Sequence, residues 1–260
     1  MPPKPKHLGP EYAAQFQDQS MADVYQQRPP YPAEVFSILA DLISDTPRAV
    51  LDIGCGDGVI ARKLIDRVER VDAVDFSQAM IAQGQRLPGG DHPKLRWIAG
   101  RAEDAPLHPP YALITAGASL HWMDWEVVFP RFRQMLTSNG LLAIVDLLEL
   151  PEAWSAAVQQ LIPRYSTNQD YLPYDLVEEL EQRHLFKKHG EQRTTPILFG
   201  QSIDAYIESF HSRNGFSRER MRPEMAAAFD AEVKNVLTAS CRLGLVPFHI
   251  VGVVVWGTPR

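Results

Sequence analysis

The hydrophobic and polar positions in the first 150 residues follow two alternating patterns. Short apolar runs of strand length predict buried strands, and apolar residues at helical spacing fill most of the segments between them. We predict strands at 50–53, 70–75, 95–99, 112–116 and 141–147. Strands that alternate with helices form right-handed βαβ units. The pattern therefore predicts a parallel sheet, and ligands of such sheets bind at the carboxyl ends of the strands.

Helical patterns flank these strands. Segments 11–27 and 33–44 are amphipathic, and a proline-rich break separates them because proline disrupts a helix interior. The first of the two is interpreted as an N-terminal lid. A further helix is expected from 125 to 136, closed by the Asn-Gly pair at 139–140.

Beyond residue 150 the pattern changes to helices rich in aromatic residues. We expect a helical insertion over the ligand site at 151–183, a strand within 185–199, and a second helical excursion at 201–244. The apolar run at 248–256 is predicted to be an antiparallel last strand. The predicted fold class is therefore α/β, a Rossmann-like seven-stranded mostly parallel sheet with an antiparallel last strand and helical lid insertions.

The predicted elements divide the chain into four parts. These are an N-terminal arm and lid (1–32), a Rossmann-like core (33–150), the first helical insertion (151–183), and the rest of the core sheet with the second excursion (184–260).

Composition narrows the partners that we expect. With 260 residues, of which 45% are hydrophobic, the chain can bury a full core. Its net charge of −6 disfavours nucleic acid as a partner, because a phosphate backbone calls for a basic face. Two cysteines are too few for a disulfide framework, and no apolar run is long enough for a signal peptide or a membrane span. We therefore expect a cytoplasmic protein that contacts neither nucleic acid nor membrane.

A glycine-rich turn follows the first strand, in the sequence V-L-D-I-G-C-G-D-G at 50–58. A dinucleotide fingerprint would place its third glycine where Val59 stands. Asp52 and Asp57 would also repel a pyrophosphate. Acidic groups instead favour a ligand with a sulfonium and an ammonium, so charge favours S-adenosylmethionine over a dinucleotide.

Four stretches together resemble the class I S-adenosylmethionine-dependent methyltransferases. They are the turn at 50–58, V-D-A-V-D-F-S at 71–77, A-G-R-A-E-D-A-P-L at 99–107 and A-L-I-T-A-G-A-S-L-H-W at 112–122. The chain is most similar to the small-molecule group that includes trans-aconitate methyltransferases, over its first 150 residues and its last strand. The resemblance implies S-adenosyl-L-methionine as donor and S-adenosyl-L-homocysteine as product. It also implies methyl transfer by in-line displacement to an oxygen, nitrogen or carbon of a small molecule.

The residues expected to bind the donor come from the N-terminal arm, the glycine turn and the strand ends. They are Tyr25, Arg28, Asp52, Gly54, Cys55, Gly56, Asp75, Phe76, Met80, Ala102, Glu103, Ala116 and Gly117. By resemblance, Tyr25 and Arg28 lie over the methionine end, although they stand closer together than in the family pattern. Asp75 ends the second predicted strand, where a carboxylate can accept both ribose hydroxyls. Phe76 and Met80 are candidates for an apolar wall beside adenine.

The chain departs from the family after the third strand, where an acidic residue, an alanine and a glutamate are usual. Here Arg101 stands in the first place, and an arginine cannot accept a hydrogen bond from adenine. That contact would then come from a backbone carbonyl, from Glu103 or from Asp104. We expect Ala102 and Glu103 to be involved.

The acceptor is expected near the end of the fourth strand, where Ser119, His121 and Trp122 are the candidate substrate-binding residues. His121 and Tyr25 are the candidate catalytic residues. An imidazole titrates near neutral pH, so His121 could orient the acceptor or take its proton. The alternative is a core or capping histidine. In the second predicted strand, 70–75, Asp72 is expected to be a solvated or capping residue.

Other functions stay open at this point. They are a nicotinamide-dependent oxidoreductase, a catalytically silent methyltransferase-fold protein that binds a metabolite or partner, and a methyltransferase acting on RNA or protein. No histidine pair or carboxylate cluster has ligand spacing, so we expect no metal. The aromatic insertions favour a partly apolar or planar acceptor, and the protein is expected to be a monomer or a homodimer.

Overall fold

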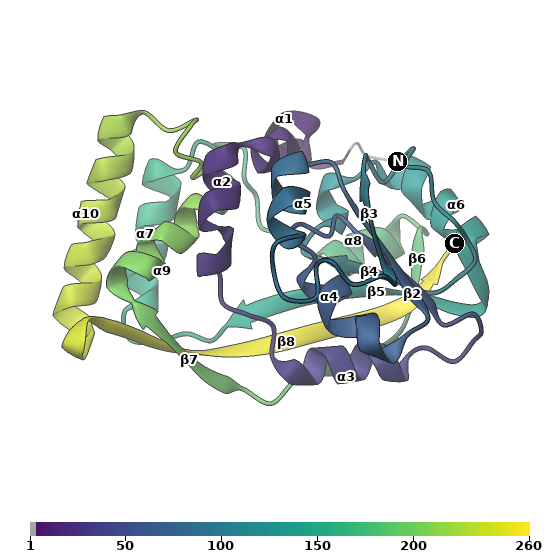
Figure 1. Cartoon of the computed structure of the whole chain (residues 1–260). Helices are drawn as coiled ribbons and strands as arrows, with labels where there is room; N and C mark the ends of the chain where they lie inside the picture. Colours follow the sequence, from purple (N-terminus) through teal and green to yellow (C-terminus); the bar gives the residue numbers. More distant parts are fainter. Residues whose placement is uncertain (1–3) are drawn as a thin grey trace.

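A single twisted sheet forms the centre of the molecule (Figure 1). The computed structural model describes residues 4–260, and in that part of the chain eight strands follow the order β3-β2-β1-β4-β5-β8-β6, with β7 also paired to β8. The strands are β1 (Ala49–Ile53), β2 (Arg70–Asp75), β3 (Leu95–Ala99), β4 (Tyr111–Gly117), β5 (Leu136–Glu149), β6 (Phe186–Arg193), β7 (Ile197–Ser202) and β8 (Leu245–Pro259).

The first five strands are parallel, and the last three add antiparallel pairs. The predicted fold class is confirmed, with one strand more than expected. The extra strand arises because the single strand expected within 185–199 is divided. β6 pairs with residues 253–259 of β8, and β7 pairs with residues 245–250 on the same edge.

Helices cover both faces of the sheet (Figure 1). They are α1 (Pro10–Ala13), α2 (Gln19–Val24), α3 (Ala33–Asp41), α4 (Val59–Leu64), α5 (Gln78–Gly84), α6 (Trp125–Met135), α7 (Ser155–Tyr165), α8 (Leu176–Gln182), α9 (Ile203–His211) and α10 (Pro223–Ser240). Successive residues of β1 point to opposite faces, as the period of a strand requires. Val50 packs in the core under α3 and α4, whereas Leu51 packs in the core under α6.

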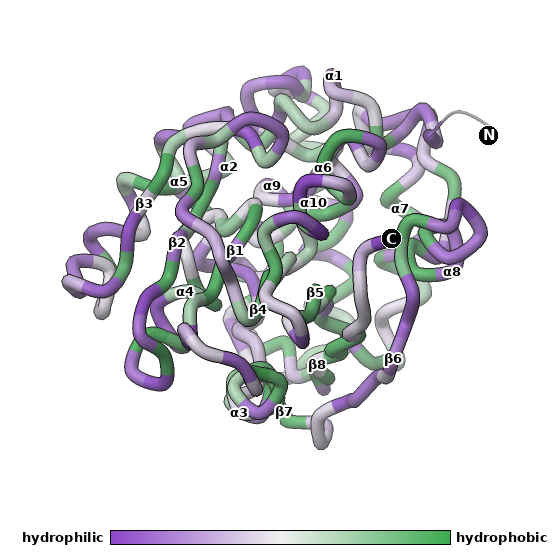
Figure 2. The backbone as a smooth tube through the Cα atoms, turned by 90° about the vertical axis from the view of Figure 1, so that its right-hand side faces the viewer, coloured by the Kyte–Doolittle hydropathy of each residue, from purple (hydrophilic) through white to green (hydrophobic). Residues whose placement is uncertain are grey.

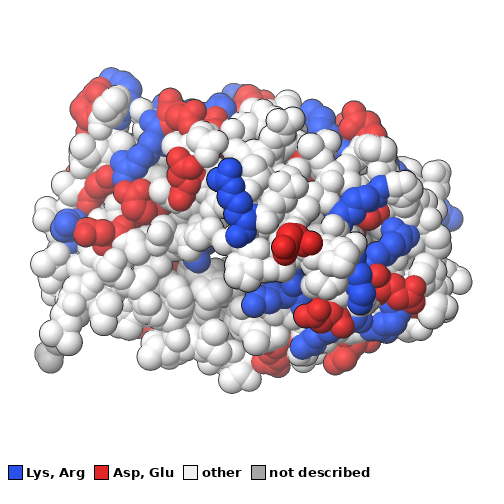
Figure 3. Space-filling view, in the orientation of Figure 1, with Lys and Arg blue, Asp and Glu red and all other residues white. Residues whose placement is uncertain are grey.

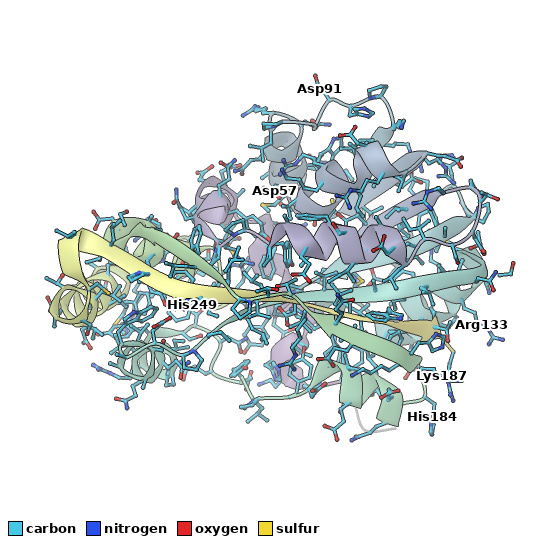
Figure 4. The ribbon with its side chains drawn as sticks, turned by 90° about the horizontal axis from the view of Figure 1, so that it is seen from below. Asp57, Asp91, Arg133, His184, Lys187 and His249 are labelled. Carbon is cyan, nitrogen blue, oxygen red and sulfur yellow. The ribbon has the colours of Figure 1, made fainter. Side chains whose placement is uncertain are left out.

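A third apolar core lies at one end of the sheet, where α7, α9 and α10 pack on β7 and on the first half of β8 (Figure 1). Helix α7 of the first excursion therefore shares one core with the helices of the second, although strand β6 separates them in the sequence. Figure 4 shows the sheet from below, with His249 of β8 beside the end where these helices pack and Lys187 of β6 near the other end. In Figure 2 the hydrophobic segments follow the central strands, while β6 is largely hydrophilic. The four-part domain division stays a prediction.

Helix α6 ends earlier than the sequence indicated. Its last residue is Met135, and Leu136 already pairs with Tyr111 across an irregularity between β4 and β5. The Asn-Gly pair at 139–140 therefore lies within β5 and does not close the helix. No helix in the described part of the chain has the length and apolar character that a membrane crossing requires.

Asp72 corrects another expectation, because its side chain is buried and not solvated. Parallel sheets are covered on both faces, so a polar residue in a central strand reaches solvent on neither face. Its carboxylate pairs with Arg96 at 2.8 Å and with Arg70 at 3.2 Å, and it accepts a hydrogen bond from the Tyr111 hydroxyl. These partners compensate the cost of burying the charge.

Candidate active site

The glycine turn after β1 has a backbone that other residues could not easily adopt. Gly54 and Gly58 have φ angles of +63° and +74°, in the left-handed region. A Cβ atom on Gly54 would lie 2.5 Å from Cβ of Ser119, and one on Gly58 would lie 2.3 Å from the Trp97 ring. Packing and conformation both require glycine, and they leave the peptide groups of the turn open to a ligand.

Asp75 joins this turn to the end of β2. Its Oδ2 accepts a hydrogen bond from the Gly56 amide at 2.7 Å, and its Oδ1 accepts one from the Ser77 amide at 2.8 Å. Burial raises the pKa of the carboxyl group. Each oxygen keeps a further lone pair for an acceptor bond, which suits a ligand with two adjacent hydroxyls, such as a ribose.

A cavity of about 440 Å³ opens over the turn and the strand ends. Twelve of the residues proposed from the sequence line it: Tyr25, Arg28, Gly54, Gly56, Asp75, Phe76, Met80, Ala102, Glu103, Gly117, Ser119 and Trp122. Asp52, Cys55 and Ala116 are buried and do not line this cavity, which we call the donor cavity. The structure thus brings together residues from the arm, the turn and the ends of β2 and β4.

The N-terminal arm covers the donor cavity through Tyr25 and Arg28. The Tyr25 hydroxyl lies 3.5 Å from the position that a Cβ on Gly56 would take. Arg28 stacks on the Tyr25 ring, and it donates hydrogen bonds from Nε and Nη2 to Ser212 after α9. Two of the guanidinium nitrogens therefore tie the arm to the second excursion. Among residues 4–260, Nη1 keeps no hydrogen-bond partner and is available to a ligand carboxylate.

Glu103 and Arg101 pair with each other at the opposite end of the donor cavity. Oε2 of Glu103 accepts a hydrogen bond from Arg101 Nε at 3.3 Å, and Oε1 accepts one from the Asp124 amide at 2.8 Å. Both Glu103 oxygens are therefore engaged, and the positive charge at the unusual position 101 is neutralised. The adenine contact of Glu103 stays a prediction.

Buried carboxylates surround the glycine turn. Asp52 accepts hydrogen bonds from Thr115 Oγ1 at 2.8 Å and from the Ala61 amide at 3.1 Å. Burial, with smaller contributions from the neighbouring Asp75 and Asp57, raises its pKa to about 7. Burial also raises the pKa of Asp57, which lies in the turn before α4 (Figure 4). Burial thus makes ionisation of these groups less favourable than in water, and a positively charged ligand nearby would favour their ionised forms.

A second, larger cavity of about 1280 Å³ meets the donor cavity at Trp122, which lines both. We call it the acceptor cavity. Its floor is the sheet, where alternate residues 144, 146 and 148 of β5 lie beside Val253 and Val255 of β8. Its roof includes His7 of the arm and Tyr174 of the first insertion.

His121 lines the acceptor cavity and not the donor cavity. Its ring centroid lies 4.6 Å from that of Trp122. Burial lowers the pKa of the imidazole to about 3, and nearby Lys4 and Arg28 contribute. The ring is therefore neutral at neutral pH, which corrects the expectation that it titrates there. A neutral imidazole can still donate a hydrogen bond to a bound methyl acceptor, or accept one from it.

Sequence reasoning missed two residues of the acceptor cavity. Asp146 ends the parallel part of β5, and the rule that found Asp75 at the end of β2 would have indicated it too. His7 lies in the arm, where no motif indicated it. Among the described residues, no group of three or more His, Cys, Asp or Glu side chains could hold a metal ion. The expectation of a metal-free reaction stays a prediction.

Part of the chain is similar in sequence to known proteins. Residues 50–140 match a family model described as a methyltransferase domain. A trans-aconitate 2-methyltransferase of Acidovorax sp. (strain JS42) is 34% identical over 178 residues, which cover 66% of this chain and 58% of that protein. A malonyl-[acyl-carrier protein] O-methyltransferase of Halalkalibacterium halodurans is 32% identical over 129 residues, or 45% of this chain and 47% of that protein. The chain thus spans about half the length of these curated relatives.

The fold is also found in solved structures. A candidate type II methyltransferase from Anaeromyxobacter dehalogenans superimposes with a TM-score of 0.67 and is 24% identical. The superposition covers 89% of this chain and 97% of that protein. At this identity the likeness establishes the fold alone.

Proposed function

We propose that the chain is a class I, S-adenosylmethionine-dependent methyltransferase that methylates a small molecule; the match of residues 50–140 to a methyltransferase domain and the similarity to a trans-aconitate 2-methyltransferase support this. The observation that carries the proposal is the meeting of two cavities at Trp122. The smaller is lined by the glycine turn and Asp75, as a nucleoside site would be, and the larger is lined in part by the helical insertions. We further propose that the protein is cytoplasmic, as a monomer or a homodimer.

The residues present fit the proposed donor. Asp75 has lone pairs for the ribose hydroxyls, and Nη1 of Arg28 is open to the methionine carboxylate. Phe76 and Met80 offer apolar surface to adenine. The acidic surroundings of the turn favour a cationic ligand over a pyrophosphate, which disfavours the nicotinamide-dependent alternative.

The chain's own residues would act mainly by positioning. When bound, S-adenosylmethionine supplies a methyl group on a sulfonium that is already a good leaving group. Trp122 lines both cavities, and His121 beside it can orient the methyl acceptor by a hydrogen bond. Positioning of this kind can lower a barrier by about 7–11 kcal/mol.

A fractionation assay tests whether the acceptor is a small molecule. A cell extract is divided into a fraction below about 1 kDa, an RNA fraction and a protein fraction, and S-adenosylhomocysteine is measured after incubation with each. We expect product with the small-molecule fraction alone. On the face in Figure 3 acidic and basic side chains are interspersed, which offers no broad basic surface to RNA. Product with only a macromolecular fraction would contradict the proposal.

Replacing His121 with Ala should lower turnover about tenfold, because one positioning hydrogen bond contributes about 1–1.5 kcal/mol. Donor affinity should change little, since His121 does not line the donor cavity. Both are measured in the assay above and by titration, with His189→Ala on exposed β6 as the matched control. If the variant lost stability with no separate effect on turnover, His121 would be a core histidine.

Donor affinity should depend on pH through Asp52. Its folded pKa of about 7 lies above the unfolded value, so the folded protein holds a proton that the unfolded chain loses. The contribution of this group to stability is therefore present at acid pH and is lost as pH rises toward 7. A cationic ligand nearby favours the ionised form of Asp52. The ratio of the affinity for S-adenosylmethionine to the affinity for S-adenosylhomocysteine, whose sulfur carries no charge, should therefore increase between pH 6 and 8.

Calorimetric titrations of both ligands at pH 6, 7 and 8 measure this preference. Asp52→Asn is the matched variant, and it should make the preference independent of pH over this range. A wild-type preference that stays constant with pH would contradict the role of Asp52.

A further inference from the structure

Arg28 brings a positive charge to the donor cavity. The side chain is partly buried, and within residues 4–260 it makes no ion pair. Asp57 of the glycine turn pairs instead with Arg62, at 3.6 Å. The guanidinium group of Arg28 contacts the Tyr25 ring, 4.5 Å from the ring centroid, and Ser212. A charge withdrawn from water is costly without a compensating partner, so an anionic group of a ligand is expected beside it.

Ser212 holds this guanidinium group along one edge. Nε of Arg28 donates a hydrogen bond to Oγ of Ser212 at 2.8 Å, and Nη2 donates one to the carbonyl oxygen of the same residue. Because the guanidinium group is planar, two hydrogen bonds to one residue fix both its position and its orientation. The direction in which Nη1 faces is therefore set before any ligand binds.

The Ser212 hydroxyl is itself fixed. The residue is fully buried just after α9, and its Oγ donates a hydrogen bond to the carbonyl oxygen of Ser209 at 2.6 Å. A hydroxyl has one proton, so this bond leaves only its lone pairs for Arg28. Ser212 therefore presents an acceptor, and not a donor, to the guanidinium group.

The residues on both sides of Ser212 hold its backbone. The imidazole of His211 lies 2.7 Å from a carboxylate oxygen of Asp230 in α10 and 2.8 Å from a backbone carbonyl oxygen. Arg213 pairs with Glu149 at the end of β5, at 2.7 Å. The carbonyl group that receives Nη2 of the arginine is thus anchored to parts of the fold that do not line the donor cavity.

We propose that Ser212 is a positioning residue for the methyl donor, which fixes Arg28 so that Nη1 binds the carboxylate of the donor's methionine part. This inference rests on the proposed function, because it concerns the donor site. An arginine side chain has many rotamers, and ordering them on binding costs affinity; a guanidinium group that is already ordered avoids that cost. The second helical excursion thus contributes to donor affinity, although no described residue of 201–244 lines the donor cavity.

The test compares two ligands that differ in the amino-acid group. S-adenosylhomocysteine carries the carboxylate, whereas 5′-methylthioadenosine has the same nucleoside and a thioether but no carboxylate. Each is titrated calorimetrically into the wild type and the variants. Arg28→Ala should weaken binding of S-adenosylhomocysteine at least about tenfold, and Ser212→Ala about fivefold, as lost hydrogen bonds of a charged group predict. Binding of 5′-methylthioadenosine should stay within about twofold in both variants.

Ser217→Ala is the matched control. Ser217 is a fully buried serine of the same loop, and its hydroxyl donates a hydrogen bond to Asp18 of the arm at 2.6 Å. The control therefore loosens the same arm without touching Arg28, and any effect of a looser arm should appear equally on both ligands. Thermal unfolding of each variant is compared with that of the wild type.

Two further variants separate positioning from charge and from stability. Arg28→Lys keeps the positive charge but not the planar double contact with Ser212, so it should weaken S-adenosylhomocysteine about as much as Ser212→Ala does. In the Arg28→Ala background, Ser212→Ala should change the affinity by less than about twofold, because its effect passes through the arginine.

Three results would overturn the inference. They are wild-type affinity for S-adenosylhomocysteine in Ser212→Ala or Arg28→Lys, an equal loss for both ligands in Ser212→Ala, and a loss from Ser212→Ala that persists when Arg28 is absent. Failure of both ligands to bind the folded wild type would instead contradict the proposed function. Because the wild-type titrations come first, the two failures are distinguishable.

Discussion

Replacing Asp75 with Ala should weaken binding of S-adenosylmethionine at least about 100-fold. Two charge-assisted hydrogen bonds to the ribose would be lost, each contributing about 1.5–3 kcal/mol. The variant also removes the acceptor of the buried Gly56 and Ser77 amides, which hold the turn against the end of β2. Calorimetric titration of the donor measures the change.

Asp91→Ala is the matched control for this experiment. It removes the same charge at an exposed position beyond α5, which Figure 4 shows at the outer edge of the molecule, away from Asp57. Donor affinity should then stay within about twofold, as is usual for an exposed charge. A folded Asp75→Ala protein that binds the donor as tightly as the wild type would show that the ribose does not bind at β2.

Replacing Asp72 with Ala should lower the free energy of unfolding by about 3 kcal/mol, the lower end of the cost of breaking a buried ion pair. The lower end applies because Arg70 and Arg96 are 32% and 37% exposed and can turn to solvent. The fully buried Tyr111 hydroxyl, in contrast, would lose its acceptor. Urea denaturation measures the change.

Asp66→Ala provides the comparison, because its side chain is 89% exposed and lies 4.0 Å from the His92 ring. It should change stability by no more than about 0.5 kcal/mol. Donor affinity should be unaffected in both variants, since neither residue lines the donor cavity. A loss of less than about 1 kcal/mol for Asp72→Ala would mean that the network around it contributes little to stability.

Many residues that line the donor cavity could be predicted because their signals are local in sequence. The bounds of β2 and β3 agree with the predicted strands, since turn residues enclose each apolar run. The glycine turn and Asp75 stand at strand ends, where the parallel-sheet rule places ligands. Each of these features depends on a residue and its near neighbours.

The acceptor half could not be predicted in the same way. His7, Tyr174 and Asp146 come from three distant parts of the chain, and only their packing brings them to one cavity. The tie between Arg28 and Ser212 joins residues 184 positions apart, so the expected role of Arg28 toward the donor gave no sign of it. Local patterns could not show the division of β6 from β7 either, because their shared partner, β8, lies at the end of the chain.

The most direct measurement of the central claim is calorimetric titration of the purified protein with S-adenosylmethionine, with S-adenosylhomocysteine, and with reduced nicotinamide dinucleotide as control. We predict that the first two bind at one site per chain, that Asp75→Ala weakens both, and that the dinucleotide does not bind. Folded protein that binds neither of the first two, or that binds the dinucleotide instead, would contradict the assignment of the donor cavity.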